Sequence, residues 1–157
     1  RREQKAMEPI FATIIPALYE ARGRLTIIAG QMGYFPYALK KRFPKHNLYL
    51  IDLHGLATRE IAHMGLERNL GGARGGNLNA IFGRSNTNLS RFIQSREPDI
   101  IYVRNMNDTE KSAVEKVGFA VVNPGGNIAY RLTGNPEIDD KLSGEFEGKA
   151  RKNRRKS

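Results

Sequence analysis

The spacing of apolar residues along the chain predicts alternating helices and strands. Residues 4–22 repeat apolar side chains near the 3.6-residue period, which predicts an amphipathic helix that kinks at Pro16 and ends at Gly23. Five short apolar runs predict strands, at 25–29, 48–53, 100–103, 119–122 and 127–132. Short helices are predicted between them, at 34–42, 58–64, 88–95 and 108–117, the last with Asp108 as its cap.

The order of these elements predicts the fold class. Strands alternate with helices until residue 122, and this alternation is typical of a parallel sheet with helices on both faces. The turn at 123–126 is too short for a parallel crossover, so the last two strands are expected to form an antiparallel hairpin. The sequence therefore predicts an α/β three-layer sandwich, with a mostly parallel Rossmann-like sheet and an antiparallel edge hairpin.

Three segments are expected along the 157 residues. Residues 1–23 form an N-terminal amphipathic linker helix, 24–133 the α/β domain, and 134–157 a loop and a basic, disordered tail. The stretch 65–86 holds six glycines and little apolar content, which predicts a functional or mobile loop whose role stays open. Because the chain begins with Arg1 and no methionine, we expect it to be a piece of a longer protein.

Charge changes the picture at the C-terminal end. The formal net charge is +10, and residues 148–157 carry six basic and no acidic residues, so the rest holds about +4. Such a tail can contact anionic lipid, bind nucleic acid or remain a solvated end. The chain has no cysteine, which excludes disulfides, thiolate metal sites and cysteine nucleophiles. No run reaches the roughly 18 apolar residues of a membrane span.

Candidate binding residues follow the first two predicted strands. Gly30 and Gly33 stand where strand meets helix, and a backbone without Cβ atoms lets a ligand approach closely. Asp52 lies at the end of the second strand, 22 residues after Gly30. In dinucleotide-binding proteins an acidic residue at this position holds the ribose hydroxyls. The third glycine of the Rossmann fingerprint is missing, and Pro36 interrupts the helix. Tight-turn glycines and a turn carboxylate remain the alternative interpretation.

Other side chains support binding more than catalysis. Tyr34, Phe35 and Tyr37 follow the glycines and could stack on a sugar or a base, or pack in the core. His54 stands beside Asp52, but the three histidines lack ligand spacing, so we expect no metal site. Neither a nucleophile elbow nor a P-loop occurs, and we expect no catalytic residue in this chain.

Four segments, in this order, resemble a known family: GQMGYFPY at 30–37, IDLHGL at 51–56, REIA at 59–62 and REPDII at 96–101. The chain is similar over residues 24–104 to the C-terminal soluble domain of polytopic GT-C-type glycosyltransferases, which use polyprenyl-phosphate sugars. The match departs from the family pattern at residues 83–88, where the family often has a histidine or an acid.

The resemblance implies a non-catalytic domain on the extracytoplasmic, periplasmic face of the cytoplasmic membrane. It would assist glycan or acceptor binding by the membrane-embedded remainder of the same chain, which carries the catalytic carboxylate. The domain would hold no cofactor of its own, the donor of the parent enzyme being a polyprenyl-phosphate-linked sugar. Its substrate-binding residues would line a cleft at the carboxyl ends of the first two strands: Gly33, Tyr34, Asp52, His54 and Gly55.

Two other functions fit parts of the sequence. A small S-adenosylmethionine- or nucleotide-binding Rossmann-like enzyme would place the ligand over Gly30 and Gly33, with Asp52 on the ribose. A nucleic-acid binder would use the basic tail, and its binding would weaken steeply with salt. Of these partners, a glycan or lipid-linked sugar is expected, with anionic lipid at the tail, and nucleic acid is not.

Overall fold

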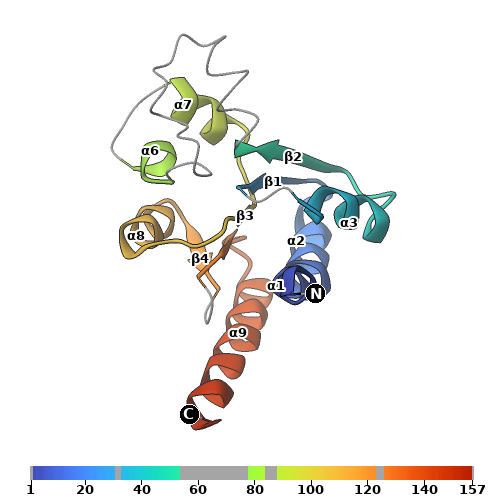
Figure 1. The fold of residues 1–157 in the computed structure, drawn as a ribbon, viewed down its shortest axis with the longest axis vertical. Coiled ribbons are helices and arrows are strands. Elements are labelled where there is room, and N and C mark those ends of the chain that lie inside the picture. Colours follow the sequence, from blue (N-terminus) through green and yellow to red (C-terminus); the bar gives the residue numbers. More distant parts are fainter. Residues whose placement is uncertain (1, 31–32, 54–77, 84–87, 123–125, 157) are drawn as a thin grey trace.

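The protein is an α/β fold in which one five-stranded sheet separates two layers of helices (Figure 1). The computed structural model describes residues 2–30, 33–53, 78–83, 88–122 and 126–156. The helices are α1 (Arg2–Pro9), the π-helical turn η1 (Ile10–Ile14), α2 (Ile15–Arg22), α3 (Phe35–Arg42), α6 (Leu78–Phe82), α7 (Asn88–Ser95), α8 (Asp108–Lys116) and α9 (Pro136–Lys156). The strands are β1 (Leu25–Ala29), β2 (Leu48–Asp52), β3 (Ile100–Tyr102), β4 (Phe119–Val121) and β5 (Ile128–Arg131).

The sheet is mixed, with strand order β2-β1-β3-β5-β4. β1 pairs in parallel with both β2 and β3, whereas β5 is antiparallel to β3 and to β4. The predicted three-layer sandwich with a parallel centre and an antiparallel hairpin at one end is therefore confirmed.

The strands β1, β3 and β5 bury both of their faces, which explains why they are continuous apolar runs. Ile27 and Ala29 of β1 belong to the core formed with α1, η1, α2, α3 and α9, and the intervening Ile28 belongs to the core formed with α6, α7 and α8. The same alternation places Ile100 and Ile101 of β3 in different cores. Figure 1 shows these two groups of helices on opposite sides of the sheet.

The N-terminal helix is interrupted as its prolines require. The N–H of Ile15 bonds to the carbonyl of Ile10, the π-helical spacing, immediately before Pro16. Pro16 has no N–H to donate to the preceding turn, so the regular hydrogen-bond ladder cannot pass through it. Gly23 closes the helix in the left-handed region, with φ of 72°. The predicted helix over 4–22 and its irregularity are thus confirmed.

The largest departure is at the C-terminal end. A loop and a disordered tail were predicted for 134–157, but residues 136–156 form α9. Leu142 and Phe146 are buried in the core, and the Phe146 ring lies 6.0 Å from that of Tyr130. These two buried side chains attach a segment that is otherwise highly charged to the sheet.

Two smaller predictions also change. Helix α8 is capped by Asn107 and not by Asp108: the Asn107 side chain accepts from the Glu110 N–H at 2.8 Å, and Glu110 accepts from the Asn107 N–H at 3.1 Å. Within the predicted glycine-rich loop, residues 78–82 form α6. The predicted helix at 58–64 and the rest of that loop up to residue 77 lie outside the described residues.

Candidate functional site

The first two strands bring the predicted polar and glycine positions to one edge of the sheet. Asp52, the last residue of β2, lies level with Ala29 at the end of β1. The next residue, Gly30, donates its N–H to the carbonyl of Tyr102 at the end of β3. Ligands bind at this carboxyl edge in open α/β sheets, so Asp52 stands where such a ligand would be.

The turn after β1 presents an aromatic pair. Gly33 has a φ of 31°, at the border of the left-handed region, and Tyr34 immediately precedes α3. The Tyr34 side chain is 38% exposed and that of Tyr37, one helical turn later, 59%. Their rings lie 5.3 Å apart at an angle of 48°. Two adjacent aromatic side chains thus reach the surface at the start of α3, and aromatic residues are enriched at recognition surfaces.

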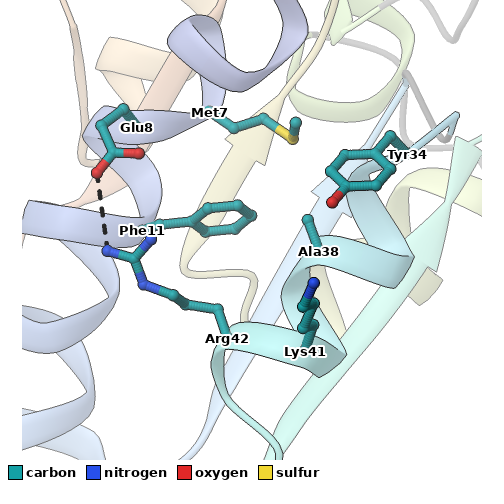
Figure 2. A pocket seen from close by; sticks show the side chains of 7 residues that line it. All are labelled: Met7, Glu8, Phe11, Tyr34, Ala38, Lys41 and Arg42. Carbon is teal, nitrogen blue, oxygen red and sulfur yellow. Dashed lines mark ion pairs between the residues drawn. The ribbon is translucent and has the colours of Figure 1, made fainter. Parts of the chain in front are cut away.

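A cavity of about 440 Å³ opens beside Tyr34, between α3 and the N-terminal helix. Figure 2 shows the Met7 and Phe11 side chains on one side of it and Tyr34 and Ala38 on the other. Phe11 also stacks on the buried Phe35 ring at 5.8 Å, which fixes the apolar wall.

The rim of the cavity is cationic. Lys41 and Arg42, in the last turn of α3, line it together with Glu8 of α1. The Arg42 guanidinium lies 3.7 Å from the Glu8 carboxylate, an exposed ion pair of small stabilising value. The Lys41 ammonium stands 5.9 Å from the centre of the Tyr37 ring. The cavity therefore joins apolar walls and aromatic faces with a net charge of one positive, because Glu8 offsets one of the two cations, and this suits an anionic ligand with an apolar face.

The structure brings together only some of the residues that the sequence singled out. Gly33 and Tyr34 are adjacent in the turn, and Asp52 lies on the neighbouring strand, outside the lining of the Tyr34 cavity. His54 and Gly55 lie outside the described residues. Sequence reasoning missed the cavity walls because Met7 and Phe11 join α3 only through the tertiary fold.

The perturbed ionisable groups lie at the opposite edge of the sheet. Asp99 precedes β3, and only 4% of it is exposed. Burial raises the pKa of the Asp99 carboxyl above its ordinary value of 3.8, against the opposing effects of the Thr26 N–H and the Arg22 guanidinium. Burial likewise lowers the pKa of Arg131, and the Asp99 charge opposes that shift.

Within the described ranges, no group of three or more histidine, cysteine or acidic side chains could hold a metal ion. No described helix has both the length and the apolar content needed to cross a bilayer. Comparison with known protein families, curated proteins and solved structures found no match to this chain.

Proposed function

We propose that this chain is a carbohydrate-binding domain that assists a membrane glycosyltransferase from the extracytoplasmic side, while the remainder of that enzyme carries the catalytic residue. The observation that carries the proposal is the exposed Tyr34 side chain, which lines the 440 Å³ cavity and whose ring lies 5.3 Å from that of Tyr37. An aromatic face packs on the C–H face of a sugar ring and loses little conformational entropy when it binds.

The polar groups nearby fit the rest of such a ligand. Lys41 and Arg42 would bind an anionic group, such as the phosphate of a lipid-linked sugar, and the apolar walls would accept its carrier. Asp52, at the end of the adjacent strand, would accept hydrogen bonds from sugar hydroxyls. The basic residues at 148–157 would contact anionic lipid next to the membrane-embedded remainder.

The test is a binding titration of the full chain with soluble oligosaccharides and with a short-chain polyprenyl-phosphate sugar. Binding is measured by calorimetry, because only one of the six tyrosines lines the cavity and Tyr34→Ala would remove that fluorophore. Tyr34→Ala is expected to weaken binding about tenfold, which corresponds to about 1.4 kcal/mol of lost stacking. Tyr49→Ala is the matched control, because Tyr49 is 50% exposed on β2 and does not line this cavity. If Tyr34→Ala and Tyr49→Ala lose the same amount of binding affinity, the proposal is contradicted.

Asp52→Ala tests the second part of the proposed surface. It is expected to weaken glycan binding and to leave the urea unfolding curve unchanged. If the variant unfolds instead, the Asp52 carboxylate is a structural turn residue and does not serve the ligand.

The register of the first two strands also favours a second candidate, a binder of S-adenosylmethionine or a nucleotide. Asp52 beside Gly30 matches the ribose-binding position of such proteins. Pro36, the second residue of α3, argues against it, since it removes one of the first-turn N–H groups that bind a pyrophosphate. A rise in melting temperature with S-adenosylmethionine or NAD, and none with glycans, would favour this candidate.

A further inference from the structure

Four arginines gather at the edge of the sheet opposite to Tyr34. Arg22 ends α2, Arg24 precedes β1, Arg96 follows α7 and Arg131 ends β5. Because β5 runs antiparallel to β3, its carboxyl end meets the amino ends of the parallel strands. Residues far apart in the sequence thus bring their guanidinium groups to one edge.

Two adjoining cavities open among these side chains. One, of about 220 Å³, is lined by Arg22, Arg24 and Arg96. The other, of about 360 Å³, is lined by Arg22 and Arg131. Arg22 and Glu97 line both cavities, so they form the boundary between the two. The other lining residues are Thr26 and Asp99 in the smaller cavity, and Phe82, Gln94 and Val117 in the larger one.

The arginines of this edge keep guanidinium hydrogens available for a ligand. Arg96 packs over the Phe92 ring at 5.0 Å, and Arg131 donates its Nε–H to the Pro98 carbonyl at 2.8 Å. Among the residues that the structure describes, Arg24 and Arg96 make no hydrogen bond or ion pair through their guanidinium groups. Arg22, Arg24 and Arg96 are exposed and Arg131 is half-buried, and the planar fork of a guanidinium group matches the oxygen pairs of phosphates.

The carboxylates in the lining do not neutralise the four positive charges. Asp99 is committed to the fold: its Oδ2 accepts from the Thr26 N–H at 2.8 Å, and its Oδ1 lies 3.2 Å from Nε of Arg22. Glu97 is the other acid in the lining. Counting both, the edge keeps an excess of two positive charges.

Glu97 has an unusual backbone for its position. Its φ of 49° is the one left-handed value among the described non-glycine residues. Such a conformation is unfavourable for a glutamate, yet it brings the residue to the boundary of the two cavities, where its charge acts on Arg131. A carboxylate in that place partly balances the arginines and competes with any anion that enters.

We propose that this edge binds a small molecule that carries a diphosphate, with one phosphate at Arg24 and Arg96 and the other near Arg131, and with Glu97 as an internal competitor. The site is separate from the Tyr34 cavity and does not depend on the carbohydrate proposal.

The test is an amide NMR titration of the full chain with pyrophosphate, with ionic strength held constant by KCl to remove general screening. The expected result is saturable shifts at Thr26 and Asp99. Arg24→Gln and Arg96→Gln should each weaken binding at least about tenfold, and Glu97→Gln should tighten it several-fold. Arg104→Gln is the matched control, since Arg104 is exposed beyond the other end of β3, and it should change the affinity less than about twofold.

Three outcomes would overturn the proposal: no saturable shifts at this edge, equal losses in Arg104→Gln and Arg24→Gln, or a Glu97→Gln variant that binds more weakly. Inorganic phosphate and glycerol 1-phosphate form the second arm. If these two monophosphates bind about tenfold more weakly than pyrophosphate, the result supports two phosphate positions. If they bind as tightly as pyrophosphate, the result refutes a diphosphate ligand. Urea unfolding checks each variant, and Arg24→Lys, which keeps the charge, replaces Arg24→Gln if the latter loses stability.

Discussion

Replacing Asp99 with alanine should destabilise the fold strongly, although its carboxylate lies at the edge of the sheet. The backbone of Asp99 joins three strands: its N–H donates to the Thr26 carbonyl at 2.7 Å, and its carbonyl accepts from the Arg131 N–H at 2.8 Å. The side chain adds a bond from the Thr26 N–H at 2.8 Å and an ion pair with Arg22 at 3.2 Å. Asp99→Ala keeps the backbone bonds and removes both side-chain contacts.

The cost follows from what is left unpaired. A buried N–H without an acceptor, here that of Thr26, costs about 1–3 kcal/mol. Breaking a buried ion pair costs about 3–5 kcal/mol, but the Arg22 side chain is 30% exposed and can turn to water, so its share is smaller. We expect Asp99→Ala to lower the free energy of unfolding by about 3 kcal/mol, measured by urea denaturation and circular dichroism at pH 7.

Asp99→Asn is the matched control, because it keeps an oxygen for the Thr26 N–H. Its unfolding free energy should lie within about 1 kcal/mol of the wild type at pH 7. A loss as large as that of alanine would show that the charge, and not the hydrogen bond, holds the edge together, and would refute this reasoning.

The raised pKa of Asp99 fixes the direction of the pH effect. The folded state holds the proton more tightly than the unfolded state, whose ordinary value is 3.8. The stability that this group contributes is therefore complete below about pH 3.8 and is lost as the pH rises through the folded pKa. The wild type should gain stability relative to Asp99→Asn as the pH falls from 7 towards 4. If the difference in unfolding free energy between the wild type and Asp99→Asn stays constant or shrinks as the pH falls, the raised pKa of Asp99 is contradicted.

Three further substitutions have expected outcomes in the same urea assay. Phe146→Ala should cost about 3–5 kcal/mol, because α9 docks through this buried ring; a loss below about 1 kcal/mol would mean that α9 does not pack on the sheet. Asn107→Ala should cost about 1 kcal/mol through the lost capping box, with Asp108→Ala, one residue along, as the milder control. Glu97→Gly should raise the unfolding free energy by up to about 1 kcal/mol by relieving the left-handed backbone, and a clear loss would show that its carboxylate stabilises the arginines.

The sheet was predictable because its strands are buried on both faces. Apart from Thr26, β1 and β3 consist of apolar and aromatic residues, and such short continuous runs are typical of buried strands. The hairpin followed from the length of the turn at 123–126, which allows no parallel crossover.

Helix α9 escaped prediction because the charge of its segment masks a sparse apolar pattern. Ile138, Leu142 and Phe146 recur every four residues, which is the helical period. This repeat of three apolar residues is visible in the sequence, but the many charged residues around it favour the prediction of a disordered tail. The cap was also readable, since Asn107 followed three residues later by Glu110 forms a capping-box pattern.

The site was predictable only in part, for a physical reason. Tyr34 could be found because a turn after a strand of an α/β sheet faces the ligand edge. Its cavity could not, since one wall comes from Phe11 and the other from α3, and only the tertiary fold joins them. The burial of Asp99 was equally hidden, because an acid after Pro98 is typical of an exposed turn.

The most direct test of the account is to map where a glycan ligand contacts the full chain, by amide NMR shifts during titration with the short-chain polyprenyl-phosphate sugar. The account predicts shifts concentrated at Tyr34, Ala38 and Lys41 and at Asp52, which need about tenfold more ligand to saturate in Tyr34→Ala and are unchanged in Tyr49→Ala. Shifts spread over other faces, or unchanged in Tyr34→Ala, would contradict it.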